Sequence, residues 1–499
     1  MKNIPEVILG IVVGSTNWMS TELAIQRRQE LFKEYVNRYG QEHVHECQIC
    51  IDDNEINVKR ALKDIEKAGC NAICLYFGNY GPEHTSTILV EQFTGPIIFC
   101  ASAEDSGKHM QAERKDSYSG LLNACYGLGL KKKRVFLPSK PVGTKEECAE
   151  MIHDFLPIAR SLLAIKELKI ISFGPRPSSY FAAYAPNHLL YELGVEIDEY
   201  SEMELFNSYE KHEGDQRIEG LVSGMEQETG ERNQLMGKYA QYEITVKDWI
   251  RTHKGNRKYV ALTSTCWPAF PVNFGFVPCY ANSRLTGEGI PVACEVDVYG
   301  ALSEYIGQSV SDDVVTVLNF NNNISEDIYE EQVKGRNFNG KEYKLSDLFL
   351  GYHCGVTNSA KLQSVSLEPH FVNAQLIGQE GSQGTIQGEM KAGFITCFRI
   401  QGDADGYLKA YVVEGQILPV NIDTYGGRGV IAVTEMERFY RNVLLGKHYP
   451  NHFALISGHY GKQLIAILNQ LGIKEIEYNH PENVPYLNEN IFESNENWY

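Results

Sequence analysis

The stretch from residue 290 to residue 323 gathers the side chains best suited to chemistry. A short apolar run over residues 290–294 leads into Glu295 and Asp297. A second apolar run over residues 314–318 leads into a polar cluster made of Asn319, Asn321, Asn322 and Asn323. Both runs have the length of buried strands, and ligand sites in α/β sheets form at the carboxyl ends of strands. Carboxylate and amide oxygens from two neighbouring strand ends suit a hard divalent cation such as Mn²⁺ or Mg²⁺. The structural alternative is that the acids only cap the helix expected over residues 300–306.

The composition is that of a soluble globular chain and argues against two classes of partner. A hydrophobic fraction of 43% and a charged fraction of 22% are ordinary. The formal net charge of −18 argues against nucleic acid and against an anionic membrane surface. No apolar run approaches the ~20 residues of a membrane span, and the N-terminus lacks the pattern of a signal peptide. The twelve cysteines lie in apolar segments, as free thiols do in a reducing compartment, so we expect a cytoplasmic protein.

The order of elements predicts an α/β fold with two layered, Rossmann-like domains followed by a β-rich, barrel-like C-terminal domain. Residues 1–165 alternate strand and helix signals, and residues 166–355 begin a second α/β unit that carries Glu295 and Asn319. Residues 356–499, which carry His452, contain period-2 alternation with glycine turns, typical of antiparallel strands. We expect a loop or irregular helix entry over residues 212–232. No GxGxxG follows the first strand and no Walker sequence occurs, which excludes a dinucleotide cofactor.

At four other places the residues could take part in chemistry, and each place also has a plain structural interpretation. Cys47 and Cys50 have CxxC spacing, but the segment alternates like a strand and no second CxxC follows. Arg176 follows a predicted strand and could hold an anionic or hydroxylated ligand, or it is a solvated loop charge. Trp267 stands in a turn after a strand and is either a pocket wall or a packed corner. His452 flanks a short apolar strand and is either a ligand or a structural histidine.

Five segments, in order, resemble those of L-fucose isomerase and the related arabinose isomerases. They are CWP at 266–268, ACEVDVYGAL at 293–302, LNFNNN at 318–323, YHCG at 352–355 and PNH at 450–452. The glycine-punctuated stretch 384–418 is also similar to the β-rich domain of that family. The resemblance covers most of the chain and is strongest between residues 255 and 460.

The resemblance implies an aldose–ketose isomerase that acts on a free monosaccharide through an enediol and uses Mn²⁺ or another divalent cation. A glutamate, an aspartate and a histidine hold the metal in that family, and sugar oxygens complete its shell. The matching positions here are Glu295, Asn319 and His452, with Glu295 and Asn319 also the catalytic pair. Trp267 and Asn321 are the expected substrate-binding residues. The family assembles into oligomers, so we expect a homo-oligomer, a trimer or a hexamer.

The chain departs from the family pattern at two positions. Asn319 stands where the family has its aspartate, and an asparagine can offer an amide oxygen to a cation but cannot act as a general base. Ala269 stands where relatives often carry an acid. Asp297 is the nearest replacement carboxylate, but it shares a side with Glu295 only if the strand continues that far. The alternative function is therefore a divergent sugar- or metal-binding homologue with altered or no isomerase activity, and a subunit that keeps only the scaffold is a third hypothesis.

Overall fold

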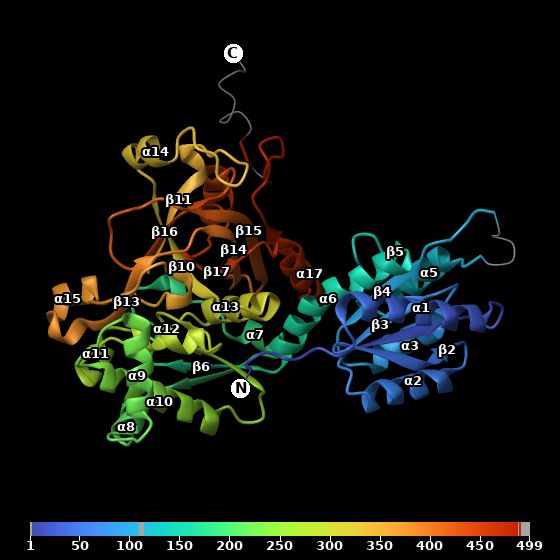
Figure 1. The fold of residues 1–499 in the computed structure, drawn as a ribbon, viewed down its shortest axis with the longest axis horizontal. Coiled ribbons are helices and arrows are strands. Elements are labelled where there is room, and N and C mark those ends of the chain that lie inside the picture. Colours follow the sequence, from blue (N-terminus) through green and yellow to red (C-terminus); the bar gives the residue numbers. More distant parts are fainter. Residues whose placement is uncertain (1, 109–113, 488, 491–499) are drawn as a thin grey trace, which may run out of the picture. The chain divides into compact units, whose positions relative to one another are not determined.

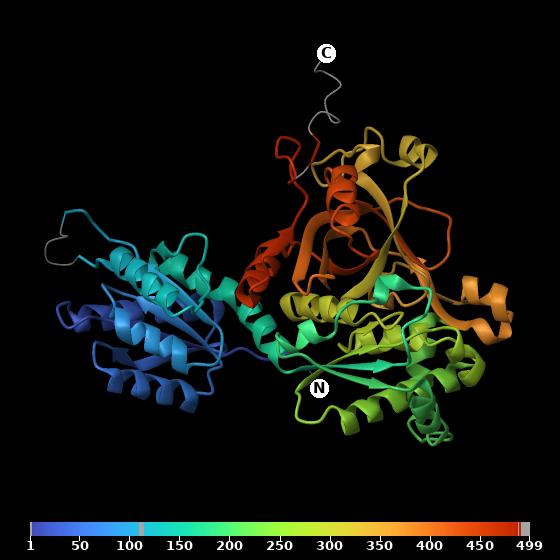
Figure 2. The same ribbon diagram turned by 180° about the vertical axis from the view of Figure 1, so that it is seen from behind.

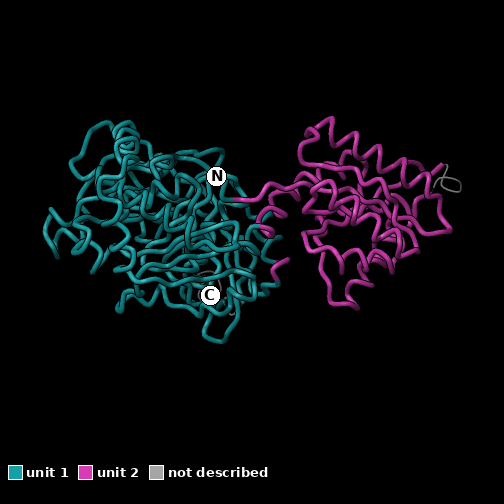
Figure 3. Tube along the Cα trace, turned by 90° about the horizontal axis from the view of Figure 1, so that it is seen from below, with its two compact units in different colours: residues 1–3, 164–468, 472–499 teal, residues 4–163, 469–471 magenta. Residues whose placement is uncertain are grey.

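The computed structural model describes residues 2–108, 114–487 and 489–490, and it divides the chain into two compact units (Figure 3). The N-terminal unit consists of residues 4–163 and 469–471, and the main unit of residues 1–3, 164–468 and 472–499. The three-domain division with boundaries at 165 and 355 stays a prediction. Within the described part of the chain, no helix combines the length and the apolar content needed to cross a bilayer.

The N-terminal unit is built on a five-stranded parallel sheet with the strand order β2-β1-β3-β4-β5. Its strands are β1 (Leu9–Gly14), β2 (Val44–Ile51), β3 (Ala72–Phe77), β4 (Ile97–Ser102) and β5 (Val142–Gly143). Its helices are α1 (Thr21–Tyr39), α2 (Glu55–Lys67), α3 (Glu83–Gln92), α5 (Ser117–Leu130) and most of α6 (Lys145–Lys166). The β1, β3 and β4 strands are buried along their whole length, as expected for a parallel sheet covered by helices. The predicted layered α/β arrangement is confirmed here.

The main unit begins with a four-stranded parallel sheet, in the order β7-β6-β8-β9. Its strands are β6 (Leu168–Phe173), β7 (Glu196–Tyr200), β8 (Tyr259–Thr263) and β9 (Val292–Ala293). The helices between and after them are η1 (Phe181–Ala183), α7 (His188–Tyr191), α8 (Glu202–Glu210), α9 (Ile218–Thr229), α10 (Met236–His253), α11 (Ala269–Phe274), α12 (Cys279–Gly287) and α13 (Val298–Ser311). The chain leaves β6 toward β7 on one side and later adds β8 on the other side. The strand order therefore reverses between β6 and β8, and ligands of open α/β sheets bind at such a point, outside the carboxyl ends of the strands.

The rest of the main unit is organised on a nine-stranded sheet, in the order β12-β13-β16-β11-β10-β17-β14-β15-β18. Its strands are β10 (Thr316–Asn323), β11 (Leu348–His353), β12 (Ser366–Pro369), β13 (Gln383–Glu389), β14 (Gly393–Gly402), β15 (Leu408–Leu418), β16 (Gly427–Ala432), β17 (His452–Ser457) and β18 (Glu475–Glu477). Around it lie α14 (Glu326–Gln332), η2 (Leu345–Asp347), η3 (Ser359–Lys361), α15 (Phe371–Ile377), η4 (Glu380–Ser382), α16 (Met436–Phe439), η5 (Tyr440–Leu445) and most of α17 (Gly461–Leu471). Because β15 also pairs with β16, the pairings run around a ring of six strands from β16 through β11, β10, β17, β14 and β15. The β-rich C-terminal part is thus confirmed.

One expectation about the sheets is wrong. The runs before Glu295 and Asn319 were expected to be neighbouring strands of one α/β sheet. Instead β9 closes the edge of the parallel sheet, whereas β10 pairs antiparallel with β11 and β17 in the nine-stranded sheet. A short buried apolar run has the same pattern in either kind of sheet, so the sequence could not assign the partner strands.

Helix α13 joins the two sheets of the main unit. It lies between them in both views, and it contacts β8 and β9 on one side and β14 and β17 on the other (Figure 1, Figure 2). Nearly all of its residues are buried, as expected for a helix without a solvent face. At Gly307 a Cβ atom would approach the side chain of Ile456 in β17 to 2.9 Å, so the small residue permits the close contact. The N-terminus of α13 therefore lies where the two sheets of the main unit meet.

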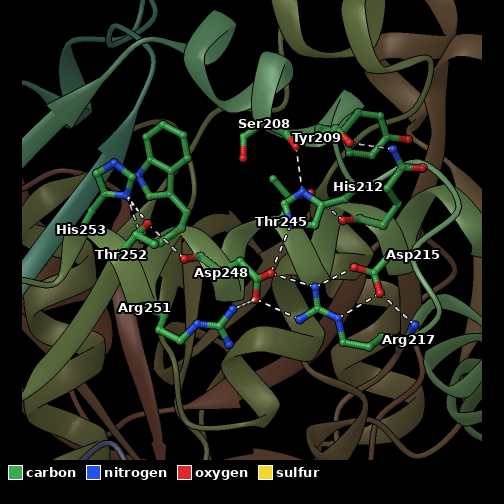
Figure 4. A network of polar contacts seen from close by, with 12 residues as sticks. Ser208, Tyr209, His212, Asp215, Arg217, Thr245, Asp248, Arg251, Thr252 and His253 are labelled. Carbon is green, nitrogen blue, oxygen red and sulfur yellow. Dashed lines mark hydrogen bonds and ion pairs between the residues drawn. The ribbon is translucent and has the colours of Figure 1, made fainter.

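A second expectation is corrected at residues 212–232, which include the regular helix α9. Glycines within this segment lower its intrinsic helix propensity. Val222 and Met225 are buried in the core of the main unit, and this packing outweighs the low helix propensity. An ion-pair network anchors the turn before α9 to α10 (Figure 4). Arg217 contacts Asp215 at 2.7 Å and Asp248 at 2.8 Å. The pairs are partly exposed, so they order the connection more than they stabilise it.

Candidate active site

The turn between β9 and α13 gives its two acids different roles. Glu295 and Val296 both have φ near +57°, the left-handed region that is costly for a β-branched side chain. This reversal ends the strand before Glu295, so Asp297 does not continue it. Asp297 instead caps α13, and its carboxylate accepts a hydrogen bond from the Gly300 amide at 2.9 Å. The alternative interpretation of the sequence, in which an acid after the strand caps the next helix, is therefore correct for Asp297.

Asp297 is engaged in a buried ion pair, so it is not a free catalytic base. The Arg399 guanidinium donates to both of its carboxylate oxygens, at 2.5 and 2.9 Å, and both side chains are at most 1% exposed. Burial alone would raise the pKa of Asp297, but the charge of Arg399 and the contact with His452 hold it well below its usual range. The suggestion that Asp297 replaces the missing family carboxylate as a base is thus not supported by its surroundings.

His452, the first residue of β17, is oriented by Asp297. Its Nδ1 lies 2.9 Å from the Asp297 carboxylate, and its Nε2 lies 3.4 Å from a carboxylate oxygen of Glu295. Burial lowers the pKa of His452, but its hydrogen bonds and charge interactions with Asp297 and Glu295 outweigh burial and raise it to about 9. The ring therefore carries a proton while no cation is bound, and a cation would have to displace it, after which a histidine held through one nitrogen by a carboxylate presents the other nitrogen as a metal ligand.

Asn319 lies beside His452 through strand register. In the β10–β17 pairing Asn319 is directly opposite His452, and directly opposed residues project from the same face of a sheet. Its Oδ1 atom is buried and has no hydrogen-bond partner among the described residues. A buried acceptor without a partner costs about 1–3 kcal/mol, unless a ligand supplies the missing contact.

The donor set formed by these residues fits a hard divalent cation. Glu295 offers a carboxylate oxygen, His452 a nitrogen that Asp297 has oriented, and Asn319 an amide oxygen without a protein donor. The two oxygen donors suit Mn²⁺ and Mg²⁺, and the imidazole favours a transition-metal ion such as Mn²⁺ over Mg²⁺. The three predicted metal ligands are therefore candidates for one site, as the sequence suggested.

Two further residues border this site, and sequence reasoning missed both as site residues. Tyr180, in the loop after β6, donates its hydroxyl to Asn451 Oδ1 at 2.9 Å. The hydroxyl oxygen of Tyr180 also lies 3.2 Å from His452 Nε2. Burial and the charge of Glu295 raise the pKa of Tyr180, so it stays protonated. The rings of His353 and His452 are 6.0 Å apart, and burial with the charge of His452 lowers the pKa of His353 to about 3, which keeps it neutral. His353 ends β11 and lies in the YHCG segment that carried the family resemblance, whereas Tyr180 lies in a loop and had no local signal.

The two predicted substrate-binding residues lie in different surroundings. Trp267 packs against the buried cluster that contains Cys294, the residue before Glu295. Asn321 is exposed and lines a cavity of about 890 Å³ together with Phe320, Tyr329 and Tyr440. Glu295, Asn319 and His452 are not among the residues that line this cavity. The substrate-binding roles of Trp267 and Asn321 stay predictions.

A cluster of soft ligands lies close to Glu295 but suits a metal less well. Ligand atoms of Cys266, Cys279 and His370 lie within 4.8 Å of one another, and all three residues are buried. His370 Nδ1 accepts the Asn373 amide at 3.3 Å, so in the neutral ring Nε2 carries the proton and faces Cys266 Sγ at 3.9 Å as a donor. The hydrogen bond with Cys279 and burial raise the pKa of Cys266 well above its usual value. The cluster is therefore better described as packed neutral thiols than as a thiolate metal site.

The fold and this donor set define a class of protein before any comparison is made. An α/β protein brings a carboxylate from the turn after β9, the edge strand of its parallel sheet, against an amide oxygen and a carboxylate-oriented imidazole from two paired strands of its nine-stranded sheet. Such an arrangement is typical of an enzyme that acts on a small polar substrate with the help of a hard cation.

Comparison with known proteins identifies the family. Residues 10–166 match the family described as fucose/sulfoquinovose isomerase, N-terminal domain, and residues 351–479 match L-fucose isomerase, C-terminal domain. The chain is 26% identical to a sulfoquinovose isomerase of Priestia aryabhattai over 332 residues, which cover 64% of this chain and 67% of that protein. It is 30% identical to a sulfoquinovose isomerase of Clostridium sp. (strain MSTE9) over 175 residues, 34% of this chain and 37% of that protein. The chain belongs to the fucose isomerase-like family, and it is an isomerase.

Proposed function

We propose that this isomerase interconverts an aldose and a ketose, that it acts on a free monosaccharide through an enediol, and that it depends on Mn²⁺ or a similar divalent cation. Sulfoquinovose, a glucose-like sugar with a sulfonate on C6, is the proposed substrate, because the similar curated proteins carry that name. The observation that carries the proposal is the convergence of Glu295, the unpaired Asn319 amide oxygen and the oriented His452.

In this proposal Glu295, Asn319 and His452 hold the cation. When bound, a divalent cation supplies Lewis-acid polarisation of the sugar's carbonyl and hydroxyl oxygens. Asp297 and Arg399 keep the His452 ring in place, and their mutual charge neutralisation lets a carboxylate stay ionised in a dry environment. The site residues are thus fixed by buried contacts before substrate arrives.

Glu295 is the proposed base. In a 1,2-isomerisation through a cis-enediol, one carboxylate removes the proton from C2 and returns it to C1 on the same face of the substrate. A single base is therefore sufficient for the carbon-bound proton, and Asn319 need not supply a second one. Tyr180 and the neutral His353 are the groups available to exchange hydroxyl protons, since both border His452.

The second candidate function is a homologue that binds a sugar or a metal without isomerising it. Asn319 favours it, because the substitution removes one negative charge and one acid–base group from the family pattern. The engagement of Asp297 by Arg399 favours it as well, since that carboxylate is unavailable as a substitute.

The deciding experiment is an aldose–ketose conversion assay on the purified protein with Mn²⁺, with and without a chelator. Sulfoquinovose, L-fucose, D-arabinose and L-arabinose are the substrates. Chelator-sensitive conversion of any of them supports the isomerase, and the preferred sugar identifies the substrate class. Stoichiometric Mn²⁺ or sugar binding with no conversion of any sugar would instead support the binding homologue.

We also propose that the chain forms a homo-oligomer, a trimer or a hexamer. Helix α5 supports self-association, because its exposed face carries an apolar stripe that a monomer would leave in water. The stripe consists of Tyr118, Leu122, Tyr126 and Leu130, which are 63–73% exposed. Sedimentation velocity on the purified protein measures the stoichiometry directly.

A further inference from the structure

Arg176 is a half-buried cation whose charge the described residues leave uncompensated. Its Nε atom is buried and lacks a hydrogen-bond partner. One terminal nitrogen donates to Asn187 Oδ1 at 2.7 Å, and the guanidinium lies 5.7 Å from the ring centre of Tyr184. The chain has 64 acidic and 46 basic residues, so an arginine without an ion-pair partner among the residues placed by the structure is notable. A solvated loop charge does not explain it, because solvation would satisfy the Nε atom.

The loop that carries Arg176 also reaches the active site. It follows β6 at the point where strand order reverses, and four residues further on Tyr180 lies 3.2 Å from His452 Nε2. Tyr299, in the first turn of α13, donates to the Pro186 carbonyl at the end of this segment. Burial raises the pKa of Tyr299, and the positive charges of Arg399 and Arg176 oppose that rise. Arg176 therefore acts electrostatically on the end of α13 that Asp297 caps.

A second polar group without a partner lies beside the start of the same loop. Glu202 follows β7, and a Cβ atom on Gly174 would lie 2.9 Å from its Cγ atom. Its Oε1 atom is buried and unpaired within the described part of the chain. Two neighbouring loops at the carboxyl edge of the sheet thus each present a buried polar atom that the protein leaves unsatisfied, and a polar ligand would satisfy them.

We propose that Arg176 binds the anionic group at C6 of the substrate and so selects a sulfonated monosaccharide over a neutral one. The inference rests on the proposed function, because it takes Glu295 and His452 as the end of the site that holds C1 and C2. A guanidinium is always charged, presents N–H donors in a fixed fork, and matches the paired oxygens of sulfonate as it does those of carboxylate and phosphate. The sulfonate remains an anion at all relevant pH values, so its charge interaction with the guanidinium does not change with pH.

The test compares the wild-type protein with Arg176→Met, which keeps the length and apolar character of the side chain but removes the charge. Sulfoquinovose and 6-deoxyglucose, the same ring without the sulfonate, are the paired substrates, and glucose 6-phosphate separates sulfonate from phosphate recognition. We expect kcat/KM for sulfoquinovose to fall by roughly 10- to 100-fold, mainly through KM, because charge-assisted hydrogen bonds of this kind are lost. The value for 6-deoxyglucose should stay within about twofold. Arg336→Met, an exposed arginine of the same unit, is the matched control.

Two results would overturn the assignment. Equal losses for the charged and the neutral sugar would show that Arg176 only maintains the loop, and unchanged kinetics for both would show that it touches neither. Equilibrium binding of sulfoquinovose, measured by calorimetry with Mn²⁺ present, keeps the inference testable if no sugar is converted. Tight binding that weakens in Arg176→Met would then support Arg176 while the isomerase proposal fails, and absence of binding to the wild-type protein would refute the anion site.

Discussion

Glu295 and Asp297 are two residues apart and yet occupy different chemical environments. The left-handed backbone at Glu295 and Val296 separates them, so Asp297 turns to Arg399 and His452 while Glu295 stays partly exposed, with 19% of its side chain accessible. A carboxylate locked by a bidentate arginine has a stabilised charge and is a weak base. At the scale of single residues, we therefore propose Glu295 as the group that transfers the proton.

Glu295→Gln should abolish most of the isomerase activity. The amide keeps the shape of the side chain but removes the base and one negative charge from the cation site, so we expect kcat to fall by about 10²–10⁴-fold or more. The measurement is initial-rate kinetics with saturating Mn²⁺. Glu326→Gln, an exposed position in α14, should be inert, and activity within twofold of wild type in Glu295→Gln would refute the site assignment.

Asn319→Asp should bind Mn²⁺ more tightly than the wild-type protein. The substitution restores a second carboxylate beside His452 and adds a negative charge that a divalent cation favours. Calorimetric titration of the metal-free protein measures the change, and Asn322→Asp, exposed on the same strand, is the matched control. Weaker Mn²⁺ binding in Asn319→Asp would mean that the residue is not a ligand.

At the scale of elements, the N-terminus of α13 organises the site. The helix brings its cap residue against β14 and β17, two strands that are paired to each other in the nine-stranded sheet. At Gly300 a Cβ atom would approach the Asp297 carboxylate to 2.6 Å, so the first turn needs a residue without a side chain there. The ion pair with Arg399 therefore connects the two sheets as well as holding His452.

Asp297→Asn should destabilise the fold. The substitution leaves the Arg399 guanidinium buried and without its counter-charge, and breaking a buried pair in this way costs about 3–5 kcal/mol. Urea unfolding followed by tryptophan fluorescence gives the free energy of unfolding. Asp405→Asn, in the exposed turn after β14, should change it by less than about 0.5 kcal/mol. A loss below 1 kcal/mol in Asp297→Asn would contradict a structural role for the pair.

Glu202, at the start of α8, should make stability fall as pH rises. Burial raises its pKa from 4.5 to about 7, so the folded state keeps a proton that the unfolded state loses between these values. The penalty grows from pH 4.5 and is complete above about pH 7. Because the side chain is only partly buried, we expect Glu202→Gln to gain about 1 kcal/mol at pH 8 relative to wild type and almost nothing at pH 4.5.

Urea unfolding at pH 4.5 and pH 8 checks the expectation for Glu202. Glu213→Gln, an exposed acid in the turn after α8, should show no difference between the two pH values. The same gain at both pH values in Glu202→Gln would show that ionisation of Glu202 is not the cause.

At the scale of the whole molecule, the main unit brings residues from distant parts of the chain to one site. The Tyr180 and His452 contact joins positions 272 residues apart, and Asp297 and Arg399 are 102 residues apart. A cation held by Glu295, Asn319 and His452 would connect the β9 turn to two strands of the nine-stranded sheet. Bound metal should therefore stabilise the main unit as a whole.

Removal of divalent cations should lower the thermal stability of the protein, and Mn²⁺ should restore it. A ligand that binds only the folded state adds about 2.7 kcal/mol at 100 times its Kd. Differential scanning calorimetry after treatment with a chelator, followed by titration with Mn²⁺, measures the shift in Tm. Glu295→Gln should lose most of the Mn²⁺-dependent shift, whereas an equal shift in that variant would place the cation elsewhere in the chain.

The sequence by itself determined the features that depend on neighbouring residues. The cap of α1 at Ser20 and its end at Gly40 follow from local chemistry, and the layered α/β order follows from hydrophobic periodicity. The segments around Glu295, Asn319 and His452 also carried the family resemblance, because each motif is short and contiguous. The comparisons later confirmed that family.

The tertiary structure alone decided which side chains act together. Only strand pairing shows that β10 joins the nine-stranded sheet, where Asn319 meets His452. Arg399 and Tyr180 could not be found from spacing, because an arginine in an alternating strand and a tyrosine in a loop have no local signal for a partner in another element. Hydrophobic patterning specifies which face of an element is buried, whereas the partner of a buried charge is set by how the elements pack across the chain.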